Sequence, residues 1–153
     1  MKKFIDKAPF IIAEISANHN GSLNQAKKLI YLAKKSGADA VKLQTYTPDM
    51  MTIKDNVQKF KIKRGLWKGY NLWDLYNLGK TPLEWHKVLF SYAKKLKLKI
   101  FSTPFSEEAI LFLEKLHCPA YKISSFEMND YNLIKAAAKT KKPLIISTGL
   151  SDI

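Results

Sequence analysis

The chain has 153 residues, enough for one domain, and 46% of them are hydrophobic, which excludes an intrinsically disordered protein. Its 26 Lys and Arg residues against 13 Asp and Glu residues give a net charge of +13, which fits a lysine-rich surface, and no recognised nucleic-acid-binding module accompanies it. No apolar run approaches the ~18 residues of a membrane-spanning helix, and we expect no signal peptide, no membrane or nucleic-acid partner, and a cytoplasmic location.

Five short apolar runs predict buried strands of a parallel sheet, because such strands are covered on both faces. The runs cover residues 11–14, 40–45, 100–105, 120–125 and 144–149. Each run ends in, or is followed by, polar residues. Ligands of α/β proteins bind beyond the carboxyl ends of such strands, so we expect these polar side chains to converge on one site.

Segments with helical spacing of apolar residues lie between these strands. They cover residues 22–36, 82–97, 106–116 and 130–140. Thr81-Pro82-Leu83-Glu84 predicts a capping box at the start of the second segment, and Ser106 and Asp130 are predicted N-caps of the last two. Cys118, the only cysteine, excludes an internal disulfide and fits a reducing compartment. The alternation predicts an α/β fold of right-handed βαβ units, either an open five-stranded sheet or part of a barrel.

Residues 45–80 are too long for an ordinary connection between a strand and a helix. The stretch is rich in lysine and aromatic residues and follows a strand, so we expect it to lie over the proposed site. Two interpretations are open, namely a substrate lid and a structural or disordered insert.

Two lysines, Lys42 and Lys122, stand inside apolar strands at equivalent positions. Lysine is rarely buried without a partner, so the pair predicts a site for a multiply charged anion, with snorkelling to solvent as the alternative. The hydroxyl groups of Thr103, Ser125 and Ser147 are candidates to donate hydrogen bonds to the same anion.

Two carboxylates, Glu14 and Glu127, follow the first and fourth strands. Each is a candidate for proton transfer or for binding a sugar hydroxyl, and the alternative is a salt bridge to one of the two lysines. His19, in the turn Asn18-His19-Asn20-Gly21, is a candidate for ligand binding or for a structural role. No histidines show metal-ligand spacing, so the residues themselves predict no metal site.

Taken together, these motifs resemble the N-terminal part of the sialic acid synthase family. The ordered set consists of Ala13-Glu14-Ile15, Asn18-His19-Asn20-Gly21, Val41-Lys42-Leu43-Gln44-Thr45, Phe101-Ser102-Thr103-Pro104-Phe105, Tyr121-Lys122-Ile123-Ser124-Ser125-Phe126-Glu127 and Ile146-Ser147-Thr148-Gly149. Within the family, Gly65-Leu66-Trp67-Lys68-Gly69 and Phe126 look like the branch that makes pseudaminic acid.

The resemblance implies a (β/α)8 TIM barrel that condenses phosphoenolpyruvate with an N-acetylated amino-sugar aldehyde and releases phosphate. It also implies a divalent metal, manganese or magnesium, and a homodimer when the enzyme is full length. The family's metal-binding histidines lie beyond Ile153, as does its C-terminal antifreeze-like domain. We therefore expect residues 1–153 to be the N-terminal part, about five βα units, of such a barrel domain.

By position in the motifs, the resemblance also implies roles for individual residues. Lys42 and Thr103 match contacts to the phosphoenolpyruvate carboxylate. Lys122 and Ser125 match contacts to its phosphate, with Ser147 nearby.

The remaining roles concern the acceptor. Glu14, Gln44 and Glu127 match residues around the metal and the sugar, and the two glutamates are the candidate catalytic residues. Asn18 and His19 are further candidates for substrate binding.

Other functions stay open at this point. Within the family, the product is pseudaminic acid, N-acetylneuraminate or legionaminate. A barrel aldolase with Lys122 or Lys42 as its Schiff-base nucleophile is a second enzyme class. A non-enzymatic basic binding module is the third interpretation.

Overall fold

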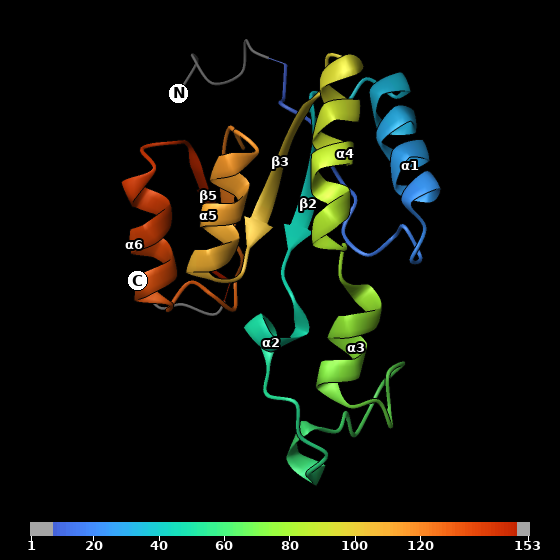
Figure 1. Ribbon diagram of the computed structural model, residues 1–153, viewed down its shortest axis with the longest axis vertical. Helices are drawn as coiled ribbons and strands as arrows, with labels where there is room; N and C mark the ends of the chain where they lie inside the picture. The colour runs from blue at the N-terminus through green and yellow to red at the C-terminus, as the bar shows by residue number, and fades with distance from the viewer. Residues whose placement is uncertain (1–7, 150–153) are drawn as a thin grey trace.

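In the computed structural model, which describes residues 8–149, helices alternate with parallel strands (Figure 1). The strands are β1 (Ile12–Glu14), β2 (Ala40–Thr45), β3 (Lys99–Pro104), β4 (Tyr121–Ile123) and β5 (Leu144–Ile146). The helices are α1 (Leu23–Lys35), α2 (Pro48–Met51), the short 3-10 helix η2 (Gln58–Phe60), α3 (Leu72–Gly79), α4 (Leu83–Lys95), α5 (Glu107–Lys115) and α6 (Tyr131–Lys139).

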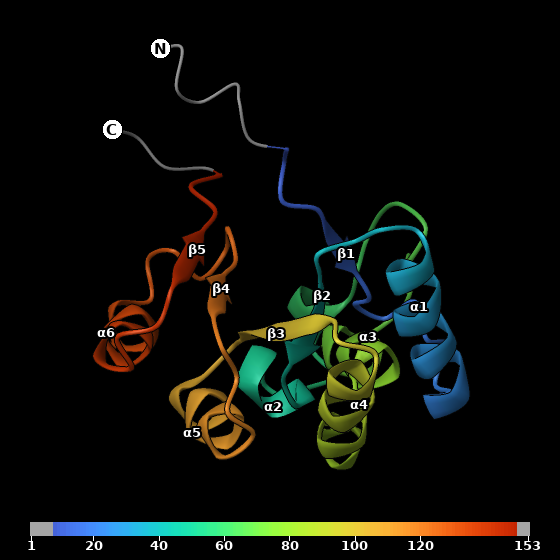
Figure 2. The same ribbon diagram turned by 90° about the horizontal axis from the view of Figure 1, so that it is seen from above.

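The five strands form one parallel sheet in the order β1-β2-β3-β4-β5, so each strand pairs with the next in sequence. The sheet is curled, with α1, α4, α5 and α6 along its outer side and its inner side open (Figure 2). The chain is therefore a half-barrel, which confirms the predicted α/β fold and selects part of a barrel over a flat open sheet.

The hydrophobic core fills the space between the outer face of the sheet and the helices. Val41 and Leu43 of β2 and Tyr121 and Ile123 of β4 are fully buried there. Helix residues that meet them are Ile30, Leu89, Leu113 and Leu133, all at most 1% exposed. Because side chains alternate along a strand, the residues between these core positions face the inside of the half-barrel.

Strand register brings the inward-facing polar residues side by side. Lys42 of β2 stands opposite Glu14 of β1, and Gln44 stands opposite Thr103 of β3. The strands β4 and β5 end earlier than predicted, at Ile123 and Ile146. After β4 the backbone turns, and the Glu127 N–H donates to the Ser124 carbonyl at 3.2 Å. The polar residues Ser125, Glu127 and Ser147 therefore lie in the loops that follow β4 and β5.

Two of the three predicted helix N-terminal caps are confirmed, and the third is wrong. The side chains of Ser106 and Asp130 accept backbone N–H groups at the starts of α5 and α6, as predicted. The predicted capping box at Thr81 is wrong, since α4 begins after Pro82 and has no side-chain cap. The hydroxyl of Thr81 is instead engaged by His19 from another part of the chain.

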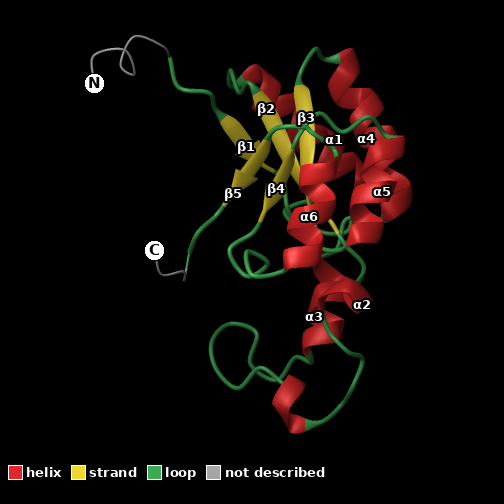
Figure 3. Cartoon of the chain, turned by 90° about the vertical axis from the view of Figure 1, so that its left-hand side faces the viewer, coloured by secondary structure: helices red, strands yellow, loops and turns green. Residues whose placement is uncertain are grey.

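The segment between β2 and α4 contains α2, η2 and α3 and extends beyond the carboxyl ends of β2 and β3 (Figures 1 and 3). Asn71, which is 8% exposed, organises it. Its side chain accepts the Trp73 N–H at 2.9 Å as the N-cap of α3 and donates to the Asp55 carbonyl. The segment is therefore a folded insert beside the predicted site. Among the described helices, none has the length and apolar character needed to cross a membrane.

Candidate functional site

A cavity of about 610 Å³ opens at the carboxyl ends of the strands, where the sequence predicts a site. Its lining includes Gln44, Lys122, Ser125, Glu127 and Ser147, all predicted site residues. They come from the ends of three strands and the loops after them, and the insert contributes Met51 and Tyr76. The volume lies in the ordinary range for small-molecule sites.

Lys42 is 8% exposed and lies among polar groups of the neighbouring strands. Its ammonium group pairs with the Glu14 carboxylate and donates to Thr103 Oγ1 at 3.2 Å. The salt bridge is the alternative that the sequence left open for Glu14. Three adjacent strands thus supply one charged cluster, in which Lys42 keeps a partner and remains positioned inside the half-barrel.

Lys122 lies close enough to Lys42 for the two charges to interact. Burial lowers the pKa of Lys122, and the positive charge of Lys42 lowers it further, against the opposing effect of Glu14 and Glu127. Both effects disfavour the ammonium form, and a bound anion would offset both. Of the two interpretations of these lysines, the interaction between them therefore favours binding of an anion over exposure of both side chains to solvent.

Glu127 follows β4 and reaches the same cavity. Within the described residues, its Oε2 atom is buried and has no hydrogen-bond partner. Burial raises the pKa of this carboxyl, although the charge of Lys122 partly opposes that effect. A carboxyl that retains its proton more readily is suited to act as a general acid.

Ser125 and Ser147 bring hydroxyl groups to the cavity from the loops after β4 and β5. The Ser147 N–H donates to the Ile123 carbonyl at 3.1 Å, which holds the two loops together. At Gly149 the backbone has a φ of +24° and passes so close to Ser125 that any Cβ there would collide with the Ser125 hydroxyl. The glycine of the motif Ser147-Thr148-Gly149 thus lets the two loops approach.

Glu14, Lys42 and Thr103 form the charged cluster beside this cavity, whereas Asn18 and His19 belong neither to that cluster nor to the cavity wall. Asn18 donates from its side-chain amide to the Ile15 carbonyl at 3.0 Å. The ring of His19 is 1% exposed, accepts the Gly21 N–H at Nδ1 (3.1 Å) and donates from Nε2 to Thr81 Oγ1 at 3.2 Å. Burial lowers the pKa of His19, in keeping with a neutral ring that anchors the turn.

Aromatic residues of the cavity wall were not predicted. Tyr46, which directly follows β2, is 6% exposed and makes edge-to-face contacts with Tyr76 at 6.1 Å and Phe105 at 5.4 Å. Burial raises the pKa of Tyr46 to about 12. The sequence does place an aromatic residue, Tyr46, directly after the second predicted strand, where we expected polar site residues.

Metal ligands are sparse in this part of the chain. Across residues 8–149 no group of three or more His, Cys, Asp or Glu side chains is placed to hold a metal ion. Glu14 is paired with Lys42, which leaves Glu127 Oε2 as an unpartnered carboxylate oxygen. The described residues therefore do not fit a metal by themselves.

Comparison with known proteins shows a match to the NeuB family over residues 29–153. The chain is 54% identical over 143 residues to pseudaminic acid synthase of Helicobacter pylori, covering 94% of the chain and 42% of that enzyme. It is 38% identical over 144 residues to N,N'-diacetyllegionaminic acid synthase of Legionella pneumophila, covering 94% of the chain and 40% of that enzyme.

Solved structures resemble the half-barrel closely. The N-acetylneuraminic acid (sialic acid) synthetase of Leptospira borgpetersenii, in complex with citrate, matches with a TM-score of 0.80 and 25% identity, over 95% of this chain and 46% of that chain. The spore coat polysaccharide biosynthesis protein SpsE of Bacillus subtilis matches with a TM-score of 0.70 and 34% identity, over 92% of this chain and 36% of that chain. The chain thus spans less than half the length of these relatives, and the matched parts are their N-terminal portions.

Proposed function

Because the chain belongs to the NeuB family, we propose that it is part of an enzyme that condenses phosphoenolpyruvate with an N-acetylated amino-sugar aldehyde. The product would be a nonulosonic acid, and pseudaminic acid is favoured by the 54% identity to a pseudaminic acid synthase. The observation on which the proposal depends most is the pair of interacting lysines, Lys42 and Lys122, beside a cavity lined by hydroxyl groups.

Phosphoenolpyruvate carries a carboxylate and a phosphate, and the cluster offers a place for each. Lys122, Ser125 and Ser147 line the cavity and would bind the phosphate through charge-assisted hydrogen bonds. Lys42 on β2 and Thr103 on β3, which are hydrogen-bonded to each other, would bind the carboxylate. An anion with two charged ends matches two lysines better than a single charge would.

The proposed reaction balances with water as the third reactant. A bond forms between C3 of phosphoenolpyruvate and the aldehyde carbon, water adds to C2, and the C2–O bond breaks to release phosphate. The aldehyde oxygen becomes a hydroxyl and takes one proton. Water loses two protons as its oxygen becomes the C2 carbonyl, of which one restores the proton donor and the other leaves with the phosphate. Glu127, with its raised pKa and unpartnered oxygen, is the proposed donor. Glu14 keeps Lys42 in position for the carboxylate.

A divalent metal, manganese or magnesium, belongs to the proposal through the family resemblance alone. When bound, such an ion would polarise the aldehyde. The described residues do not form its site, so no step above depends on it.

A Schiff-base aldolase is the second candidate, because the lowered pKa of Lys122 favours the neutral amine that attacks a carbonyl. Borohydride reduction in the presence of pyruvate distinguishes the two. A covalent adduct on Lys122, detected by mass spectrometry, would favour the aldolase, whereas the condensation forms no imine.

Titration of the chain with phosphoenolpyruvate, followed by calorimetry, tests the proposal. Replacing Lys122 by alanine removes a charged hydrogen-bond donor, so the expected loss is about 1.5–3 kcal/mol of binding free energy, or about 10- to 150-fold in Kd. Lys87→Ala is the matched control, since Lys87 is exposed on α4. Equal affinities of the two variants would contradict the assignment.

A further inference from the structure

A second cavity, of about 460 Å³, adjoins the cavity at the carboxyl ends of the strands. Tyr46 and Tyr76 line both, so the two tyrosines form the wall that they share. We call the second cavity the aromatic pocket, and its other lining residues include Trp67, Leu78, Gly79 and Asn20. None of the residues that take part in the proposed reaction lines it.

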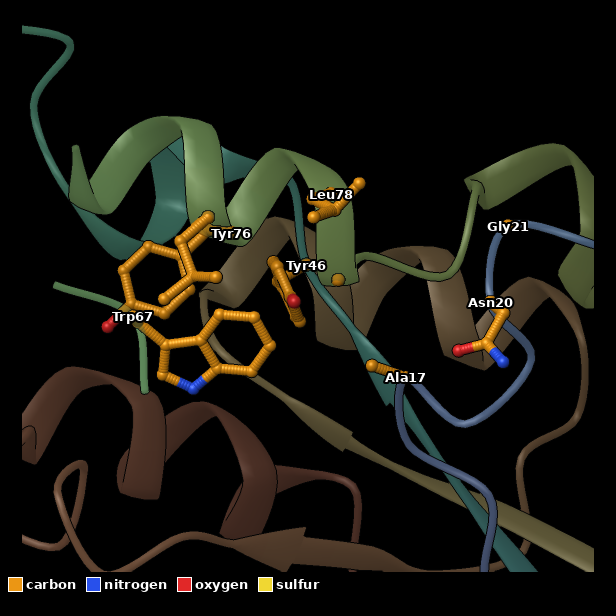
Figure 4. A pocket seen from close by; sticks show the side chains of 9 residues that line it. Ala17, Asn20, Gly21, Tyr46, Trp67, Tyr76 and Leu78 are labelled. Carbon is orange, nitrogen blue, oxygen red and sulfur yellow. The ribbon is translucent and has the colours of Figure 1, made fainter. Parts of the chain in front are cut away.

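One end of the aromatic pocket is built from rings (Figure 4). The indole of Trp67 lies beside Tyr76, and Tyr46 stands next to them. Trp67 also contacts Tyr70 edge-to-face, with ring centroids 6.0 Å apart, and Tyr46 contacts Tyr76 in the same way. These contacts fix the rings, yet Trp67 remains 45% exposed, so part of its surface is available to a ligand.

The other end is polar and comes from the turn after β1. Asn20 faces the pocket across from the rings, with Ala17 between them (Figure 4). Its backbone has a φ of +48°, and the neighbouring His19 and Gly21 hold the turn through the hydrogen bond between the Gly21 N–H and His19 Nδ1. The anchoring of His19 to Thr81 thus places the amide of Asn20 at the pocket.

We propose that the aromatic pocket binds the acetamido group of the acceptor sugar, with Trp67 as the residue that selects for it. An acetamido group has a polar amide and an apolar methyl, and the pocket has a side-chain amide at one end and rings at the other. Asn20 would hydrogen-bond the sugar amide, and the methyl would contact the rings. This assignment rests on the proposed function, because it places the acceptor next to the phosphoenolpyruvate cavity across Tyr46.

Saturation-transfer-difference NMR on the 153-residue chain tests the pocket directly. The probes are the N-acetylhexosamines of gluco, galacto and manno configuration, each beside its parent hexose. At least one N-acetylhexosamine should bind with the strongest saturation on its acetyl methyl, and the hexoses should bind about tenfold more weakly. Trp67→Ala should weaken that binding about tenfold.

Two variants complete the design. Asn20→Asp keeps a residue that tolerates positive φ but removes the amide donor, and it should also weaken binding. Leu66→Ala is the matched control, because Leu66 neighbours Trp67, is 87% exposed and does not line the pocket. Its binding should equal that of the unmodified chain. Circular dichroism of each variant establishes that the fold is retained.

The outcomes separate this inference from the proposed function when phosphoenolpyruvate is titrated into the same samples. Lys122-dependent phosphoenolpyruvate binding without a Trp67-dependent methyl signal would overturn the pocket assignment alone. A Trp67-dependent methyl signal without phosphoenolpyruvate binding would support the pocket and count against the proposed reaction. Equal saturation of the methyl in the Trp67→Ala and Leu66→Ala variants would also overturn the assignment.

Discussion

Two residues of the site are shifted toward their uncharged forms, and in both the main cause is burial. The pKa of Lys122 is lowered and that of Glu127 is raised. The charged form of each group therefore destabilises the folded protein. A lysine with a lowered pKa beside a carboxyl with a raised pKa is typical of sites that bind anions and transfer protons. The behaviour of both residues should therefore change with pH.

Phosphoenolpyruvate affinity should depend on pH through Lys122. In the proposed function the ammonium form of Lys122 binds the phosphate, and burial lowers the pKa of this group below its ordinary value of 10.5. Affinity should therefore fall as pH rises toward 10.5, at a lower pH than an ordinary lysine would allow. Lys122→Arg should bind with little pH dependence over that range, because a guanidinium stays charged. An equally steep decline in the arginine variant, measured by calorimetry, would exclude Lys122 as the titrating group.

Thermal stability should depend on pH through Glu127. The folded state raises the pKa of the Glu127 carboxyl above its ordinary value of 4.5. The protein therefore loses stability as the pH rises from 4.5 through the pKa of the folded state, because the folded state holds this proton more tightly than the unfolded state does. The melting temperature of Glu127→Gln, minus that of the unmodified chain, should increase between about pH 4 and pH 8. Differential scanning calorimetry measures both. A difference that stays constant with pH would show that Glu127 titrates normally.

At the scale of elements, a hydrogen bond between distant segments replaces an expected local one. Thr81 stands three residues before Glu84, as in a capping box, but its hydroxyl accepts from His19. The ring of His19 also packs edge-to-face on Trp85 of α4 with centroids 5.4 Å apart. The turn after β1 is thereby fixed to the start of α4, next to the aromatic pocket.

Removing the Thr81 hydroxyl should therefore destabilise the protein. Thr81→Val leaves the buried His19 Nε2–H without an acceptor, at an expected cost of about 1–3 kcal/mol in the free energy of unfolding. Thr140→Val is the control, since the hydroxyl of Thr140 bonds the Ala137 carbonyl at the half-buried end of α6. Urea unfolding followed by circular dichroism compares the two. A smaller loss for Thr81→Val than for Thr140→Val would argue against a structural role of His19.

Local patterns sufficed to predict some features and not others. Apolar runs and N-caps depend on neighbouring residues, and so β2 and the caps at Ser106 and Asp130 were predicted correctly. The capping box at Thr81 was wrong because a distant histidine competes for the hydroxyl. The aromatic pocket was missed because Tyr46 and Trp67 meet only through the fold of the insert. The chemical roles of the site residues remain predictions.

At the scale of the whole molecule, the described half-barrel leaves apolar surface and strand edges uncovered. In the described region, β1 and β5 each pair with one neighbour and form the edges of the sheet. Large apolar side chains on or beside these edges are exposed, among them Phe10 (54%), Ile11 (51%), Ile145 (41%) and Ile146 (44%). Open edges with apolar side chains favour association.

The isolated 153-residue chain should therefore self-associate. Sedimentation velocity should show species larger than a monomer, in proportions that rise with concentration. Ile146→Lys places a charge on the edge strand and should reduce association. Leu111→Lys is the control, because Leu111 is 64% exposed on α5, away from the sheet edges, and should leave association unchanged. A monomer at all concentrations would contradict this account.

The proposed reaction is tested most directly in a chimaera with a longer relative. The 143 aligned residues of this chain would replace the corresponding portion of the Helicobacter pylori pseudaminic acid synthase, to which they are 54% identical. With phosphoenolpyruvate and the acetamido-sugar substrate of the parent enzyme, the chimaera should release phosphate, and Lys122→Ala should abolish that release while Lys87→Ala should not. A folded chimaera that releases no phosphate, or whose rate is unchanged by Lys122→Ala, would contradict the proposed function.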